Sequence, residues 1–100
     1  MLDSLHYQDF SPYINSKFTV HLDETATMDI TLIGAEEKDP SPKQEQFILH
    51  FQAPPDAPRY QMTFTVRHEQ LGAGLMFLVP VGQNESGILL EAVFNRPRQA

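Results

Sequence analysis

Four histidines are the side chains of this sequence best suited to bind a metal ion, because imidazole is a common ligand of zinc and other transition metals. They are His6, His21, His50 and His68. No two of them follow a His-x-His or His-x3-His spacing, and the chain has no cysteine that could complete a site. We therefore interpret all four as surface histidines, and we expect neither a metal nor any other cofactor.

Serine hydroxyls and paired carboxylates are the other groups that could support catalysis. Ser4, Ser16 and Ser86 lack the Gly-x-Ser-x-Gly context that presents a nucleophilic serine. The carboxylate pairs at residues 23–24 and 36–37 lie in polar segments, where solvation keeps the pKa of a carboxyl group near its usual value. The sequence therefore predicts that the protein is not an enzyme.

Two short motifs have simple structural interpretations. The tripeptide Asn84-Glu85-Ser86 fits the acceptor sequence for N-glycosylation, but it also suits a hairpin turn between two apolar segments. The pair Gly72-x-Gly74 is too short for a phosphate-binding loop, and no helical pattern follows it. We interpret both motifs as tight turns.

Composition and charge narrow the class of protein. A chain of 100 residues with 41% hydrophobic and 20% charged residues suits one soluble domain. The net charge of -6 argues against binding nucleic acid, since each phosphate contact needs a cation. The first residues do not resemble a signal peptide, and the longest apolar run is far shorter than the ~20 residues that span a bilayer. We expect a cytoplasmic protein that does not span a membrane, although it could enter an extracellular or tail-like structure by a signal-independent route.

Apolar and polar residues alternate in six segments, a pattern typical of strands with one buried face. The segments are 17–22, 25–33, 47–51, 62–67, 75–81 and 87–95. Residues 3–10 predict one or two helical turns, and residues 36–43 predict an exposed loop. We therefore expect one all-β domain over residues 1–100, folded as a small antiparallel barrel or a two-layer sandwich. Its short N-terminal helix would lie in a helical or turn segment at 1–16, and residues 96–100 would form a tail that buries nothing.

The alternation also predicts which side chains form the core. The expected core residues are Phe18, Val20, Met28, Ile30, Leu32, Phe47, Leu49, Phe51, Phe64, Val66, Phe77, Val79, Ile88, Leu90 and Phe94.

The last two predicted strands have apolar residues on their outward faces as well. Ile33, Ile48, Leu78, Leu89 and Val93 all fall on the face opposite the expected core. Such a face is covered either by another part of the chain, here the N-terminal segment with its Leu2, Leu5 and Phe10, or by a partner. Both alternatives remain open at this stage. If a partner covers the face, we expect the interaction residues to be Leu78, Leu89, Glu91 and Val93.

Several segments taken together carry a family resemblance. They are residues 5–13, 18–22, 47–54, the stretch 60–72 with its His68-x-x-Leu71-Gly72, and the pair 77–82 and 91–95. In this order they resemble a bacterial family known as domain of unknown function 6916. The resemblance implies a short, mostly β protein with no assigned reaction, cofactor or catalytic residue. It also implies an association with proteins that bear phage tail collar domains.

These observations predict a non-catalytic structural or interaction protein. It would be a subunit or accessory of a larger phage-tail-like or fibre-like assembly, and it would bind a protein partner or its own copies through the last two strands or an exposed strand edge. The alternative is a small β-barrel binding module for a small apolar or carbohydrate ligand. In that case Tyr7, Tyr13 or Tyr60 would contact the ligand at the barrel mouth.

Overall fold

Six antiparallel strands and three short helical turns make up the protein, for which a computed structural model describes residues 2–38 and 43–97. The strands are β1 (Lys17–His21), β2 (Thr27–Glu37), β3 (Gln44–Ala53), β4 (Met62–His68), β5 (Gly72–Asn84) and β6 (Gly87–Pro97). They follow the 3-10 turn η1 (Leu2–Ser4), the helix α1 (Tyr7–Phe10) and the 3-10 turn η2 (Ser11–Tyr13). The predictions of an all-β fold, six strands and a short N-terminal helix are therefore confirmed.

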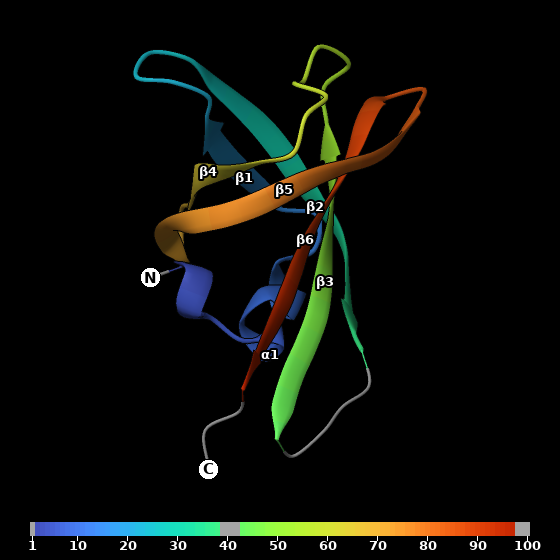
Figure 1. The fold of residues 1–100 in the computed structure, drawn as a ribbon. Helices are drawn as coiled ribbons and strands as arrows, with labels where there is room; N and C mark the ends of the chain where they lie inside the picture. The colour runs from blue at the N-terminus through green and yellow to red at the C-terminus, as the bar shows by residue number, and fades with distance from the viewer. Residues whose placement is uncertain (1, 39–42, 98–100) are drawn as a thin grey trace.

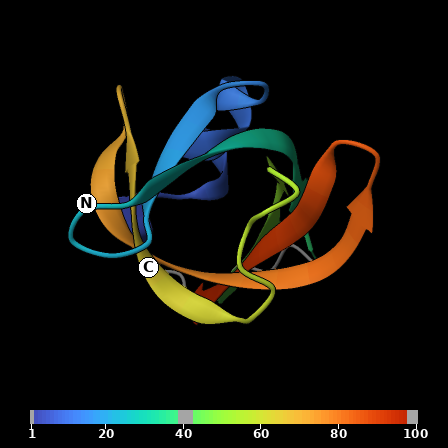
Figure 2. The same ribbon diagram turned by 90° about the horizontal axis from the view of Figure 1, so that it is seen from above.

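The strands close into a barrel in the order β1-β2-β3-β6-β5-β4, with β4 pairing back onto β1 (Figures 1 and 2). Two three-stranded meanders, β1 to β3 and β4 to β6, are joined by the β3–β6 and β1–β4 pairings. Strand β5 links two sides of the ring, because residues 72–78 pair with β4 and residues 79–84 pair with β6. Of the two predicted architectures, the barrel is the one that forms.

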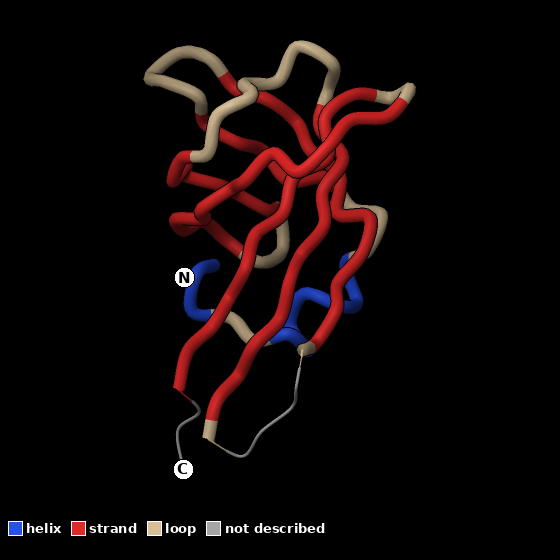
Figure 3. The backbone as a smooth tube through the Cα atoms, turned by 45° about the vertical axis from the view of Figure 1, so that its right-hand side comes forward, coloured by secondary structure: helices blue, strands red, loops and turns tan. Residues whose placement is uncertain are grey.

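Strands β2, β3 and β6 continue beyond the ring as a three-stranded sheet, and the N-terminal turns cover its inner face (Figure 3). Phe10 is fully buried, with its ring centroid 5.9 Å from that of Phe47 and 5.7 Å from that of Phe94. Leu2 is also fully buried, close to β5. The N-terminal segment thus packs on the inner face of the sheet and completes the core there. The alternative in which it covers the outward apolar face was therefore wrong.

Most of the predicted core residues are buried, but the prediction for β5 was reversed. Phe77 is 48% exposed and Val79 is half-buried, whereas Met76 and Leu78 are buried. The reason is the register with β4, which places Met76 directly opposite the core residue Phe64. Because cross-strand partners share a face, the even-numbered residues of this part of β5 point inward.

The hairpin predicted around residue 84 is confirmed, whereas the predicted tail begins too early. The Asn84 side-chain oxygen accepts hydrogen bonds from the backbone N–H groups of Ser86 and Gly87, which closes the turn between β5 and β6. Strand β6 runs through Pro97, and Arg96 is partly buried rather than free in solution. The rest of the predicted tail, residues 98–100, and residues 39–42 of the predicted loop lie outside the described residues.

Candidate functional site

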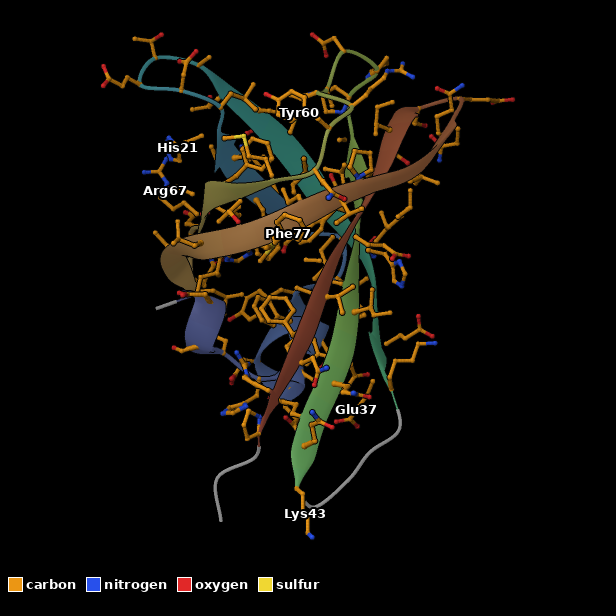
Figure 4. All side chains as sticks on the ribbon, in the orientation of Figure 1. His21, Glu37, Lys43, Tyr60, Arg67 and Phe77 are labelled. Carbon is orange, nitrogen blue, oxygen red and sulfur yellow. The ribbon has the colours of Figure 1, made fainter. Side chains whose placement is uncertain are left out.

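The outward side of β5, β6, β3 and β2 carries a group of apolar side chains that are exposed or half-buried. We call this group the outer apolar face: Ile33, Ile48, Leu75, Phe77, Val79, Val81, Leu89 and Val93. Every second residue of β5 from Leu75 to Val81 belongs to it, and Figure 4 shows Phe77 on the outside of this strand. Exposed apolar groups that lie together on a sheet mark a contact surface more often than scattered ones do.

Two shallow hollows lie within the outer apolar face. One, of about 380 Å³, is bounded by Ile33, Val81 and Leu89. The other, of about 180 Å³, lies where Ile48 and Val93 face each other across the β3–β6 ladder. Val93 is the most exposed large apolar side chain in the described part of the chain, at 60%. The face therefore offers both protruding side chains and recesses to a partner.

The structure retains three of the four predicted interaction residues on this face. Val93 is exposed, and Leu89 and Glu91 are half-buried on the outward side of β6. Leu78 is only 1% exposed, so its assignment to the interaction surface was wrong. Both neighbours of Leu78 are apolar, and alternation alone therefore could not decide which face of β5 was inside. Phe77 takes the outward position instead.

A histidine between two carboxylates interrupts the outer apolar face. His50 Nε2 lies 3.2 Å from Glu36 Oε1, and His50 Nδ1 lies 3.5 Å from Glu91 Oε2. The hydrogen bond with His50, followed by the interaction with Lys38, lowers the pKa of the Glu36 carboxyl group. Glu91 therefore already contacts a side chain of its own chain, and it is a polar group between the apolar positions of β6.

A serine–histidine pair sits at the end of β4, where His68 is 3% exposed. Its Nε2 lies 2.9 Å from the Ser16 hydroxyl, a distance typical of a nucleophile and its base. Its Nδ1, however, accepts hydrogen bonds from the backbone N–H groups of Gln70 and Leu71, so the ring proton must be on Nε2. His68 then donates to Ser16, whose hydroxyl donates to the carbonyl oxygen of Tyr13.

This arrangement cannot activate Ser16, because a general base must accept the serine proton and here the imidazole supplies one. Burial lowers the pKa of His68, which keeps the ring neutral and preserves the two hydrogen bonds from the backbone. The ring also packs against Phe18, with 4.5 Å between centroids. His68 therefore holds the β4–β5 turn in place, and its prediction as a surface histidine was wrong.

A buried carboxylate joins the N-terminal segment to β6. The Glu45 side chain is 2% exposed; its Oε1 lies 2.8 Å from His6 Nδ1 and accepts a hydrogen bond from Arg96 Nε at 3.2 Å. Its Oε2 accepts a hydrogen bond from the backbone N–H of Tyr7. Burial raises the pKa of Glu45, but the hydrogen bonds from His6, Tyr7 and Arg96 outweigh it and lower the pKa overall.

The Arg96 guanidinium completes this cluster, which we call the Glu45 clasp (Glu45, His6, Tyr7 and Arg96). Arg96 lies 5.7 Å from the Phe47 ring centroid and 5.6 Å from that of Phe94, and its Nη1 donates to the carbonyl oxygen of Asp3. The clasp therefore holds the N-terminal turns against the three-stranded sheet of β2, β3 and β6 beyond the ring. One signal in the sequence points to it, since Glu45 is in phase with the inward residues of β3.

The three tyrosines considered for ligand binding do not meet at one mouth. Tyr7 packs edge-on against Phe47, and Tyr13 packs against His68. Tyr60 is 57% exposed and lies at the end of the molecule opposite Lys43 (Figure 4). In the described ranges, no three histidine, aspartate or glutamate side chains gather closely enough to hold a metal ion.

Comparison with known proteins identifies a family but no named relative. The family model described as Domain of unknown function (DUF6916) matches residues 5–94, and the chain belongs to this family. No curated protein and no solved structure matches the chain. Within the part of the chain that the structure describes, no helix is long and apolar enough to cross a membrane.

Proposed function

We propose that this member of the DUF6916 family is a non-catalytic structural subunit that joins a larger assembly through its outer apolar face. The observation that carries the proposal is the exposure of Val93, Phe77 and Leu75 on neighbouring strands, at 60%, 48% and 53%. The N-terminal turns lie on the inner side of the sheet and leave this face uncovered. Burying such side chains against a partner is the main favourable term in protein association.

The occupant we propose for this face is a second copy of the chain. A two-fold contact brings the same patch of both copies together, so the patch must be complementary to itself. The rim of the outer apolar face carries a cation, Lys38, and two carboxylates, Glu36 and Glu91. In a two-fold contact, Lys38 of one copy can approach a carboxylate of the other while the apolar rows meet.

Within the ring, barrel closure favours this face-to-face contact over the addition of a strand, and free strand edges occur where β2 and β6 extend beyond the ring. Over residues 19–21 and 65–67, the pairing of β1 with β4 occupies the edge that an open sheet would leave free. We further propose that the assembly is phage-tail-like or fibre-like, in line with the family resemblance found in the sequence.

The test is the mass of the protein in solution, measured by size exclusion with light scattering over a concentration series. The wild-type chain should exceed its monomer mass of 11.4 kDa as concentration rises. Val93→Glu and Phe77→Glu should each weaken association about tenfold or more, because a charge would be buried in the contact. Thr27→Glu is the matched control, because Thr27 is exposed, pairs with His21 of β1 and lies away from the outer apolar face; this variant should associate like wild type.

Two results would reject self-association through this face. One is a constant monomer mass at every concentration, and the other is equal association of the wild type, Val93→Glu and Phe77→Glu. Circular dichroism of each variant separates a lost contact from a lost fold.

A binding module for a small ligand is the second candidate function. The observation that favours it is an open cleft of about 680 Å³ where β1 meets β4, a volume in the range of small-molecule sites. None of the three predicted tyrosines lines this cleft, although Tyr13 packs against His68 in its wall.

A further inference from the structure

The open cleft at the junction of β1 and β4 carries a cationic side chain, Arg67, that has no partner among the described residues. Its lining residues are Ser16, Lys17, Thr19, Arg67, His68, Glu69, Gln70, Gly72 and Ala73. The Arg67 side chain is exposed and forms no hydrogen bond or ion pair with any residue that the structure describes. In contrast, Arg59 donates to Gln83, and Arg96 is held by Glu45. In a chain with a net charge of -6, an unpaired guanidinium inside a cleft is available to bind an anion.

Strand pairing places two further basic residues near Arg67. Arg67 lies directly opposite Thr19 on β1, and Lys17 and His21 are the next residues on either side of Thr19 on the same face. Such diagonal neighbours lie ~7–8 Å apart, within reach of long side chains. Figure 4 shows His21 and Arg67 on the same side of the molecule. An anion bound to Arg67 would therefore also feel the charge of Lys17.

The nearly balanced charges around the cleft favour an anion with a single negative charge. Lys17 lies 3.8 Å from Asp29, an exposed and loose ion pair, and Glu69 lines the cleft. The two cations and these two carboxylates leave the site close to neutral. A dianionic phosphate would be repelled by the carboxylates, whereas a single carboxylate matches the planar fork of one guanidinium.

The rest of the cleft is rigid and of mixed polarity. The buried His68 ring and the Ser16 hydroxyl are tied together and to the backbone, so they form a fixed wall. Gly72 contributes no side chain to the lining and Ala73 only a methyl group, which leaves the volume open. A ligand anchored on Arg67 could place hydroxyl groups or a short apolar body against these walls without rearranging the protein.

We propose that this cleft binds a small organic acid whose carboxylate pairs with the Arg67 guanidinium. The binding rests on the second candidate function and is independent of self-association, since none of the cleft residues belongs to the outer apolar face.

The test is a titration of the 15N-labelled 100-residue chain with lactate, benzoate and glucuronate, each of which carries a single carboxylate. Binding is followed by amide NMR at a protein concentration where light scattering gives a constant molecular mass. Glucose and inorganic phosphate are the probes that lack a carboxylate. At least one carboxylate should shift the amides of Thr19, Arg67 and Ala73, and glucose should not. Binding should weaken about tenfold or more in Arg67→Ala and less in Arg67→Lys, which keeps the charge but loses the fork. Arg59→Ala is the control, because Arg59 is exposed and lies outside this cleft.

The absence of shifts with all three carboxylates would overturn the proposal, and so would equal binding to wild type and Arg67→Ala. Stronger binding of phosphate than of any carboxylate would overturn the choice of ligand class. Self-association measured by light scattering can succeed or fail independently of each of these results.

Discussion

Replacing the buried carboxylate with Glu45→Gln tests whether the Glu45 clasp holds the N-terminal turns onto the sheet. The variant keeps the size of the side chain and removes its charge, which leaves the Arg96 guanidinium, 25% exposed, without a counter-charge. Hydrogen bonds to charged groups contribute about 1.5–3 kcal/mol each, and removing one partner of a fully buried ion pair costs about 3–5 kcal/mol. Since Arg96 is partly solvated and His6 is 62% exposed, we expect a loss of about 2–3 kcal/mol in the free energy of unfolding.

The assay is urea unfolding of wild type and variant as a function of pH. The clasp lowers the pKa of Glu45 below its ordinary value of 4.5, so its stabilisation is fully present above that value. It is lost progressively as the pH falls from that value through the lower pKa of the folded state, because the unfolded chain takes up the proton first. The difference between wild type and Glu45→Gln should therefore be constant near neutral pH and shrink below pH 4.5.

The matched control is Glu24→Gln, which alters an exposed glutamate in the β1–β2 turn and should change stability by less than about 0.5 kcal/mol. A double-mutant cycle that combines Glu45→Gln with Arg96→Met measures the interaction energy between the Glu45 and Arg96 side chains. The reasoning fails if Glu45→Gln is no less stable than Glu24→Gln, or if its deficit persists unchanged at pH 3.

Three other predictions follow from the fold and the outer face. Gly74→Ala should lower the free energy of unfolding in urea by about 1.5–3 kcal/mol. The added Cβ would lie 2.5 Å from Asp3 Oδ1, so η1 and its buried Leu2 would be displaced. Ala73→Ser, at an exposed position, is the control. Since burial lowers the pKa of His68, the unfolded chain takes up a proton first, and stability should fall as the pH drops below 6.5. His68→Asn should lose this dependence, and an equal pH slope in both proteins would contradict the assignment. Raising NaCl from about 0.05 to 0.5 M should strengthen self-association of a chain with a charge of -6, because salt screens repulsion between copies; weakening measured by light scattering would indicate a contact made by charges.

The strand content could be read from the sequence because alternation with period two is a local property. In β1, β2 and β4, the apolar positions stand between threonines and charged residues, so the buried face is unambiguous. In β5, every residue from Leu75 to Val81 is apolar. Only pairing with β4, and the position of Phe64 opposite Met76, decides that Leu78 points inward and Phe77 outward.

The same contrast between local sequence pattern and tertiary contacts applies to the buried polar side chains. The sequence by itself determined six strands, their approximate bounds, the hairpin at residue 84 and an apolar outward face on β6. Tertiary structure alone decided barrel closure, the inner position of the N-terminal turns, and the burial of His68 and Glu45 against partners 52 and 51 positions away in the chain, Ser16 and Arg96. The physical reason is that burial of a polar side chain requires hydrogen-bond partners, and here the sheet brings those partners from distant parts of the sequence, where no local pattern records them.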